Sequence, residues 1–357
     1  MSSTLLKKTG RYSTYKAYPY WYIAATTKQL GKKPIRVFLW GIPLVLFRDG
    51  KGKPHALLDR CSHRNVPLSK GTVCGDSIQC PYHGWEFDGE GRCKHIPAQA
   101  DFHENQARNV PSYPVREQQG HIWVYTDTHS KPNHLPYSFP HFDDPKYRHI
   151  YYQADFDATI HATAENILDV PHTAFLHSGL FRSGNRNLIE THIQRFRDRV
   201  DCEYIGEPRP TGFIGQILAP KGGEVEHFDR FILPSIAQVE YRLENKHLLT
   251  TSALSPLSDF KTRMFAVVSV KLEIWIPFLQ SLVTPFALKI VNQDIEMLKA
   301  QTEQLQFFEG EQYSYTELDA LGPSIQRLLK KAEKTPLVLY SEEEESVEME
   351  IRSQMRV

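Results

Sequence analysis

The stretch that decides the fold is residues 61–85, CSHRNVPLSKGTVCGDSIQCPYHGW. It places Cys61 and His63 in one short loop and, after sixteen intervening residues, Cys80 and His83 in a second loop. These side chains offer two thiolates and two imidazoles. Such a set can hold a structural zinc ion, or a [2Fe–2S] cluster with two Cys on one iron and two His on the other.

The order of the four ligands separates these alternatives. Mixed zinc sites usually pair like with like, a Cys-x₂₋₄-Cys loop followed by a His-x₃₋₅-His loop. Here each loop supplies one Cys and one His, which suits two irons held between two loops, each loop giving one ligand to each iron. Nearby residues supply the tight turns that such loops need: Pro67, Gly71, Gly75, Pro81 and Gly84. The sequence therefore favours iron–sulfur over zinc.

The sequence around these loops predicts a small all-β domain. Residues 35–48 (IRVFLWGIPLVLFR) indicate two short strands joined at a turn, and residues 55–58 and 122–125 indicate further strands. No long helical period occurs before residue 130. Residues 127–148 are polar, rich in proline and aperiodic, which is typical of a connection between domains. We therefore predict a first domain at residues 1–130 and a second at residues 131–357.

The second domain is predicted to be α+β. Residues 149–160 and repeated runs within 187–275 are strand-like, whereas residues 161–176 and 286–306 have helical composition. This combination predicts an antiparallel sheet with a few helices. The run SEEEESVEME at 341–350 predicts a solvated acidic tail.

A second group of candidate metal ligands lies in residues 165–177, ENILDVPHTAFLH. Asp169 and His172 are three residues apart, so they are expected to share a helix face. His177 lies five residues beyond His172, about 140° further round a regular helix, so the helix must bulge or end between them. Two His and one carboxylate on one side of an iron leave open positions for O₂ and substrate. The residues alone leave several candidates for that carboxylate: Asp169, Asp259, Asp294, Glu296 and Glu303.

Both groups resemble motifs of the Rieske non-haem iron oxygenase family. The matching patterns are C-x-H-R-x-x-P-L-x-x-G…C-P-Y-H-G-W-x-F and E/D-N-x-x-D-x-x-H-x-x-x-x-H. The chain is most similar to the terminal oxygenase component, in the single-chain monooxygenase and demethylase branch. The resemblance implies a Rieske domain at residues 20–126. It also implies a helix-grip catalytic domain at about 140–310, in which a curved antiparallel sheet wraps a long helix.

The resemblance assigns a role to each candidate residue. It implies that the [2Fe–2S] cluster is held by Cys61, His63, Cys80 and His83. It implies that mononuclear Fe(II) is bound by His172, His177 and, in the stretch NQDIEMLKAQ, Asp294. Asp169 would link the iron ligand His172 to the cluster ligand His83 of a neighbouring subunit, which implies a head-to-tail homotrimer. Asn166 would lie near the iron, so Asp169 and Asn166 are the predicted catalytic residues. Cys74 and Cys93 have no ligand role and are expected to be buried free thiols.

The implied activity is oxidation of an apolar organic substrate, aromatic or sterol-like, by hydroxylation, demethylation or desaturation. The pattern favours a monooxygenase over a dioxygenase. The chain has no G-x-G-x-x-G opening a βαβ unit, so a separate ferredoxin or reductase must supply the electrons. A docking patch for an acidic ferredoxin is predicted from basic residues near the loops: Arg60, Arg64, Lys70, Arg92 and Lys94. The rival readings are a Rieske electron carrier without oxygenase activity and a zinc-stabilised binding protein.

Bulk composition narrows the setting. The 357 residues have formal net charge zero, which gives no reason to expect a nucleic-acid partner. Five cysteines, an odd number, argue against a disulfide scaffold, and the N-terminus lacks the apolar core of a secretory signal. We therefore predict a cytoplasmic protein. Residues 274–291 approach the length of a membrane span, but Pro277 and Pro285 favour a buried, pocket-lining or membrane-surface segment.

Overall fold

The computed structural model describes residues 9–177, 188–207, 225–243, 245–272, 279–316, 318–319, 321–335 and 346–356. The chain forms two compact units. The smaller unit is Tyr18–Ser138 with Ser255–Ser258, and the larger is Met1–Ala17, Phe139–Leu254 and Asp259–Val357. The described start of the chain lies in the larger unit because its backbone is bonded there: Gly10 N donates to Glu309 O at 2.8 Å, and Ser13 N to Glu311 Oε1 at 2.7 Å.

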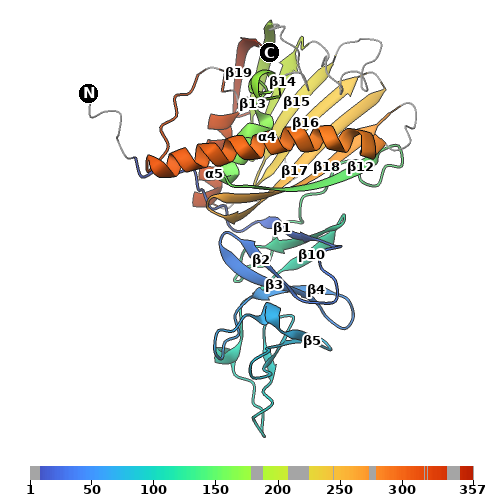
Figure 1. The fold of residues 1–357 in the computed structure, drawn as a ribbon, viewed down its shortest axis with the longest axis vertical. Helices are drawn as coiled ribbons and strands as arrows, with labels where there is room; N and C mark the ends of the chain where they lie inside the picture. The colour runs from blue at the N-terminus through green and yellow to red at the C-terminus, as the bar shows by residue number, and fades with distance from the viewer. Residues whose placement is uncertain are drawn as a thin grey trace. The chain divides into compact units, whose positions relative to one another are not determined.

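The smaller unit contains three sheets, with strand orders β1-β11-β10, β2-β3-β4-β9 and β5-β6-β7-β8 (Figure 1). The strands are β1 Trp21–Thr26, β2 Ile35–Leu39, β3 Ile42–Arg48, β4 Pro54–Leu58, β5 Thr72–Cys74, β6 Ser77–Gln79, β7 Glu86–Asp88, β8 Cys93–His95, β9 Ser112–Tyr113, β10 Val115–Gln118 and β11 His121–Tyr125. Two 3₁₀ turns join them, η2 Leu68–Lys70 and η3 Gln106–Arg108. The predicted small β domain is confirmed.

The hairpin of β2 and β3 shows why the local sequence folds as predicted. Leu39 pairs with Ile42, so the turn has two residues, Trp40 at φ 53° and Gly41 at φ 77°. Positive φ at both positions is the pattern of a type I′ turn, whose twist matches that of the two strands. Strand β3 contributes the fully buried Val45 and Phe47 to the core that also contains Cys61 and Cys80.

The larger unit is built on one eight-stranded sheet, in the order β12-β18-β17-β16-β15-β14-β13-β19. Its strands are β12 Arg148–Phe156, β13 Leu188–Arg195, β14 Arg199–Ile205, β15 Glu226–Ile232, β16 Ile236–Leu243, β17 Lys246–Ser258, β18 Lys261–Lys271 and β19 Met349–Arg356. Its helices are α1 Ile160–Leu168, α2 Thr173–Leu176, α4 Leu279–Phe307 and α5 Gly322–Lys334. The 29-residue α4 lies across one face of the sheet and contacts β12 and α1 (Figure 1). The predicted α+β class with a large antiparallel sheet is confirmed.

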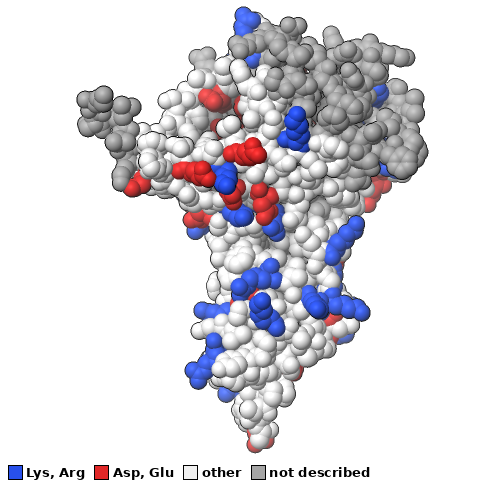
Figure 2. Space-filling view, viewed as in Figure 1, with Lys and Arg blue, Asp and Glu red and all other residues white. Residues whose placement is uncertain are grey.

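Charge is distributed unevenly between the two units. Residues 18–138 hold 15 Lys and Arg against 10 Asp and Glu, although the whole chain is neutral. Figure 2 shows Lys and Arg side chains gathered over the smaller unit. The larger unit must therefore carry the balancing negative charge.

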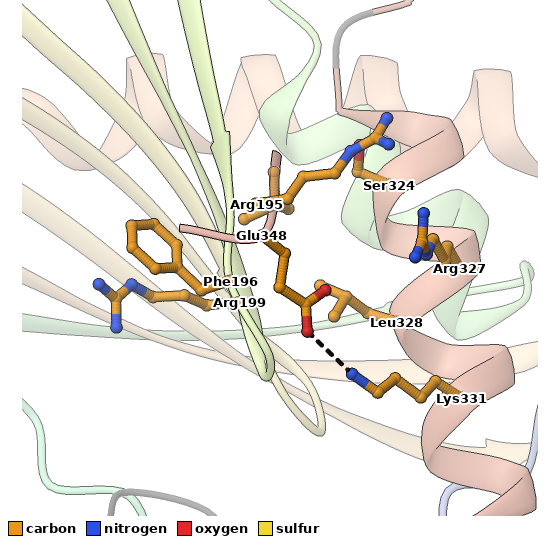
Figure 3. A pocket seen from close by; sticks show the side chains of 9 residues that line it. Arg195, Phe196, Arg199, Ser324, Arg327, Leu328, Lys331 and Glu348 are labelled. Atoms are coloured by element: carbon orange, nitrogen blue, oxygen red, sulfur yellow. Dashed lines mark hydrogen bonds and ion pairs between the residues drawn. The ribbon is translucent and has the colours of Figure 1, made fainter. Parts of the chain in front are cut away.

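The C-terminal stretch corrects one prediction. Residues 341–345 of the predicted acidic tail lie outside the described residues, but Met349 and Glu350 begin β19, which pairs with β13. Just before it, the Glu348 carboxylate lies 3.3 Å from Lys331 Nζ of α5 (Figure 3). Glu348 lies in a small pocket between β13, β14 and α5. Its carboxylate is favoured there because the pocket is also lined by four cationic side chains: Arg195, Arg199, Arg327 and Lys331. Ile351 and Met355 alternate toward the core, a two-residue period that the acidic composition obscures.

The apolar run 274–291 lies only partly within the described residues. Residues 279–291 form the start of α4, and Pro285 is the seventh residue of this helix. A proline this close to the N-terminus of a long helix removes one internal hydrogen bond without ending it. Among the described helices, none combines the length and apolarity that a bilayer crossing requires.

Candidate metal centres

The two loops that contain the predicted cluster ligands are both tight backbone turns. The Cys61 loop follows β4 and closes where Asn65 N donates to Cys61 O at 2.9 Å. The Cys80 loop joins β6 to β7 and closes where Gly84 N donates to Cys80 O at 3.1 Å. Asn65 and Gly84 both have left-handed φ, at 61° and 71°. A Cβ atom on Gly84 would also come within 2.8 Å of Pro97 Cγ, so both the turn and the packing require glycine there.

The two loops bring their four predicted ligands together. The rings of His63 and His83 lie 4.5 Å apart between centroids. His63 also stacks on Trp85, with centroids 4.6 Å apart and planes 1° from parallel. Cys61 and Cys80 are almost fully buried beneath them, whereas His83 is exposed. The sulfur ligands therefore lie inside the unit, and one imidazole reaches its surface.

The donor atoms of these four residues are not satisfied by one another and are suited to binding a metal group. His63 Nδ1 is buried and has no hydrogen-bond partner among the described residues. A buried polar atom of that kind is costly unless it binds something. Burial and the neighbouring Cys80 thiol raise the pKa of Cys61 to about 11, so a bound cation is needed to hold it as a thiolate. The residues present therefore fit a [2Fe–2S] cluster.

The remaining cysteines differ from one another in exposure. No disulfide joins any of the five cysteines in the structure. Cys93 is buried as expected, but Cys74 is exposed because it ends the short edge strand β5. The prediction that Cys74 is buried was wrong.

The second site forms where α1 ends. The Thr159 hydroxyl accepts a hydrogen bond from Ala162 N at 3.1 Å, which caps the start of α1. The helix stops at Leu168, and Asp169 is already extended, with φ −88° and ψ 106°. Pro171 explains the break, since it lacks an N–H and disfavours helix in the residue before it.

The predicted single helix at 161–176 is therefore two helices. His172 and His177 are the two cap residues of the four-residue helix α2. The predicted interruption is present, but it falls before His172 as well as at His177. Asp169 and His172 consequently meet across a turn and do not share one helix face, which corrects that expectation.

Three predicted ligands converge at this point. His172 Nε2 lies 3.2 Å from His177 Nε2, and Asp294 Oδ1 of α4 lies 3.5 Å and 3.1 Å from these two nitrogens. Metal–ligand bonds of about 2.1 Å set neighbouring donors on one ion about 3 Å apart. The triangle of donors therefore has the size that a single metal ion requires, and it matches the two-His, one-carboxylate set of non-haem iron.

Each of the three donors is held by one further side chain. Asp169 Oδ2 lies 3.2 Å from His172 Nδ1, and Gln293 Oε1 lies 3.0 Å from His177 Nδ1. The amide of Asn166 donates to Asp294 Oδ1 at 3.4 Å. The sequence pointed to Asp169 and Asn166 but missed Gln293, whose only sequence signal is its place beside Asp294.

The electrostatics of this site favour a cation. Burial lowers the pKa of His172, but hydrogen bonds to Asp169 and Asp294 outweigh it and raise the pKa to about 9. Burial raises the pKa of Asp294, but hydrogen bonds to His172 and His177 outweigh it and lower the pKa. Both pKa shifts arise because carboxylates face the imidazoles at close range. A bound metal ion would neutralise the negative charge of these carboxylates.

The other candidate carboxylates lie outside the donor triangle. Asp259 pairs instead with Lys16, whose Nζ lies 3.3 Å from its Oδ1. Glu296 and Glu303 are not in the group of donors that converge with His172 and His177. Glu165, one turn before Asp169, was also missed: burial and the Asp169 carboxylate raise its pKa to about 7. The structure thus selects Asp294 from the open set.

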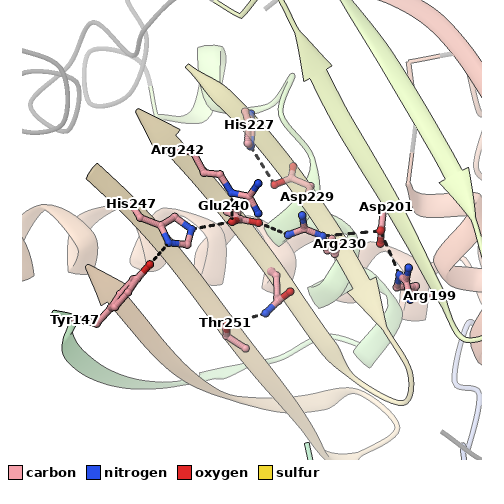
Figure 4. Close-up of polar contacts among 11 residues, drawn as sticks. Tyr147, Arg199, Asp201, His227, Asp229, Arg230, Glu240, Arg242, His247 and Thr251 are labelled. Atoms are coloured by element: carbon pink, nitrogen blue, oxygen red, sulfur yellow. Dashed lines mark hydrogen bonds and ion pairs between the residues drawn. The ribbon is translucent and has the colours of Figure 1, made fainter. Parts of the chain in front are cut away.

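A second buried charged cluster does not have metal geometry. His227 of β15 is stacked between Tyr204 and Tyr241 and is 1% exposed. Glu207 Oε2 lies 2.6 Å from its Nδ1 and Asp229 Oδ1 lies 3.1 Å from its Nε2, so the carboxylates hold opposite edges of the ring. Figure 4 shows the contact with Asp229. Burial lowers the pKa of His227, but the two carboxylates raise it to about 9. The cluster is a buried ion group within the sheet.

Two protein-family models match the segments of the chain that contain the two sites. Residues 20–114 match the Rieske [2Fe-2S] domain, and residues 156–335, just over half of the chain, match the vanillate O-demethylase oxygenase C-terminal domain. A crystal structure of dicamba monooxygenase bound to 3,6-dichlorosalicylic acid superposes with a TM-score of 0.78 at 25% identity, covering 90% of this chain and 98% of that one.

Two curated relatives are similar over part of their length. The oxygenase component of dicamba O-demethylase from Stenotrophomonas maltophilia is 37% identical over 44% of this chain and 46% of its own. Methylxanthine N1-demethylase NdmA from Pseudomonas putida is 34% identical over 52% of this chain and 54% of its own. The chain thus aligns with about half the length of these relatives. With the two family matches and the two sites, these likenesses show that the chain belongs to the Rieske non-haem iron oxygenase family.

Proposed function

We propose that this chain is the oxygenase component of a multi-component system that oxidises an apolar organic substrate with O₂ and electrons from another protein. The observation that carries the proposal is that one chain holds a Rieske [2Fe-2S] domain and a convergent two-His, one-carboxylate set. An electron carrier needs only the first of these sites. The second is the donor set of iron enzymes that keep open positions for O₂ and substrate.

Seven residues hold the two groups in this proposal. The cluster ligands are Cys61, His63, Cys80 and His83, and the iron ligands are His172, His177 and Asp294. When bound, the cluster would supply single electrons and the iron would provide the place at which O₂ is activated beside the substrate. The protein orients the donors: Asp169 holds the Nδ1 hydrogen of His172, and Asn166 donates to the Asp294 carboxylate.

Asp169 is proposed to serve a second subunit as well. Its side chain is 36% exposed although it bonds His172, so one edge of the carboxylate remains open to a partner. His83 is exposed in the smaller unit, beside Tyr82, which is 64% exposed. Phe175 in α2 is 71% exposed close to Asp169 in the sequence. A head-to-tail homotrimer would cover these surfaces and bring His83 of one subunit to Asp169 of the next.

The substrate is proposed to be an apolar ring compound, aromatic or sterol-like, that loses a methyl group or gains oxygen. The relatives named above are demethylases of dicamba and a methylxanthine, which supports monooxygenation over dioxygenation. The cytoplasmic location stays a prediction. So does the expectation that residues 274–291 form a buried, pocket-lining or membrane-surface segment.

The electron donor is proposed to be an acidic ferredoxin that docks on the smaller unit. Of the five basic residues near the loops, Arg92 is neutralised by Asp88 and Lys94 by Glu104. The other three are exposed and form no ion pair with a described residue: Arg60, Arg64 and Lys70. These three define the ferredoxin patch.

The test is reconstitution of the purified chain with a ferredoxin and its reductase. We expect a Rieske absorption spectrum and substrate-dependent O₂ consumption with a stoichiometric oxidised product. The matched control is His177→Ala, which should keep the Rieske spectrum and lose product formation. Fast cluster reduction in both proteins without product from a panel of dicamba-like, methylxanthine-like and sterol substrates would instead favour the electron carrier.

A further inference from the structure

The rings of the two iron-site histidines are held by chemically different side chains. His172 Nδ1 faces a carboxylate, Asp169, at 3.2 Å, whereas His177 Nδ1 faces a neutral amide, Gln293, at 3.0 Å. His172 is 20% exposed at its side chain and His177 only 2%. The more buried of the two rings therefore depends on an uncharged partner.

We propose that Gln293 is a positioning residue of the iron site, and that it fixes the tautomer and the rotation of His177. This inference rests on the proposed function, in which His177 is an iron ligand. A ligand nitrogen must present a lone pair to the ion, so Nε2 must be bare and Nδ1 must carry the hydrogen. Only the carbonyl oxygen of the Gln293 amide can accept that hydrogen, and this oxygen is the atom that faces Nδ1.

The geometry of α4 gives Gln293 this role. Gln293 and Asp294 are consecutive, so their side chains leave the helix about 100° apart. Gln293 Oε1 contacts Nδ1 of His177, while Asp294 Oδ1 lies 3.1 Å from Nε2 of the same ring. One turn of one helix thus contacts both nitrogens of a single imidazole, and the ring can neither flip nor turn without losing a contact.

The neutral character of Gln293 has a chemical consequence. A carboxylate at this position would draw the Nδ1 hydrogen toward itself and make Nε2 a stronger donor to the ion. An amide orients the ring without adding negative charge. The site then has two carboxylates around the histidines, Asp169 and Asp294, instead of three, so an ion bound there would be more electron-poor.

The experiment compares Gln293→Leu and Gln293→Glu in the full-length protein, stripped of mononuclear iron by a chelator and retaining its Rieske cluster. Leu has similar bulk and no acceptor, and Glu keeps an acceptor and adds charge. The control is Gln301→Leu on the same helix, because the carbonyl oxygen of Gln301 has no partner among the described residues. The readout is Co²⁺ affinity and the visible spectrum of bound Co²⁺, which reports its coordination.

We expect Gln293→Leu to weaken Co²⁺ binding by about 10- to 100-fold and to alter the spectrum. Gln293→Glu should bind at least as tightly as the wild type, and Gln301→Leu should match it. Affinity within twofold of wild type and an unchanged spectrum in Gln293→Leu would overturn the inference. If His177→Ala also binds Co²⁺ normally, the proposed iron site itself is wrong, so the two failures are distinct.

Discussion

At the scale of single residues, two imidazoles among the four cluster ligands should set the potential of the Rieske domain. Clusters with two His ligands have potentials of about −150 to +300 mV, against about −400 mV for plant-type all-Cys clusters. We predict that His63→Cys lowers the midpoint potential by roughly 200 mV or more, because a thiolate adds negative charge to the cluster. A redox titration followed by absorbance or EPR measures it.

Cys74→Ser is the control for that substitution, because Cys74 is an exposed thiol of the same unit and is no predicted ligand. Its potential should equal that of the wild type. His83→Cys provides a second test if the first variant fails to assemble. A midpoint potential equal to that of the wild type in both His variants would contradict the ligand assignment.

The sequence patterns predict the metal ligands, but they do not predict the side chains that hold those ligands in place. Cys61, His63, Cys80 and His83 were evident because their spacing is specific for two loops around one metal group. Gln293 was not evident, because a single glutamine on a helix has no pattern of its own. Its role depends on the approach of α4 to α2, a contact between segments 116 residues apart in the chain.

At the scale of elements, a group of charged side chains on strands β15, β16 and β17 should determine how the stability of the protein changes at acidic pH. Glu240 of β16 is 5% exposed at its side chain, and it contacts Arg230, Arg242 and His247 (Figure 4). Burial raises its pKa, but these three partners outweigh burial and lower it to about 2. A carboxyl group whose pKa is depressed by folding stabilises the protein above its ordinary pKa, and this contribution is lost as pH falls toward the folded value.

We therefore predict that Glu240→Gln lowers the free energy of unfolding at pH 7 by about 3 kcal/mol. It should also flatten the loss of stability between about pH 4.5 and pH 2. Urea unfolding across pH measures both effects. Glu226→Gln on β15 is the control, because Glu226 is exposed and forms no ion pair with a described residue. Equal pH profiles for wild type and Glu240→Gln would contradict the prediction.

Elements with a clear local period were predictable, and those stabilised by distant contacts were not. The hairpin of β2 and β3 and the helix α4 follow from composition and period. Strand β19 does not, because it depends on distant contacts: it pairs with β13, and Glu348 just before it pairs with Lys331 of α5. The break between α1 and α2 lies before His172, earlier than the spacing of the two histidines predicts, because Pro171 disfavours helix in the residue before it.

At the scale of the whole molecule, Asp169 should couple the two metal centres between subunits. We predict that Asp169→Asn keeps both metals and the oligomeric state but lowers product formation by at least tenfold, because the amide has one acceptor oxygen and its NH₂ group cannot accept a hydrogen from either histidine. Metal analysis, light scattering and single-turnover assays measure these three properties. Full turnover in Asp169→Asn, or a monomeric wild-type protein, would contradict the bridging role.

The ferredoxin patch should control the rate of electron entry. We predict that Arg64→Gln with Lys70→Gln slows reduction by an acidic ferredoxin several-fold at low salt and reduces the dependence of the rate on salt. Arg92→Gln with Lys94→Gln is the matched control, since both of these cations are already paired with carboxylates. Stopped-flow reduction measures the rates, and an equal loss in both double variants would contradict the patch.

The most direct test of the central claim is the iron and sulfide content of the purified chain. Two metal centres in one chain predict about three irons and about two acid-labile sulfides per chain, with a Rieske EPR signal after reduction. Replacing both His172 and Asp294 by Ala should lower the content to about two irons and leave the sulfide and the signal unchanged. A wild-type protein with about two irons, or a double variant that keeps the third, would contradict the account.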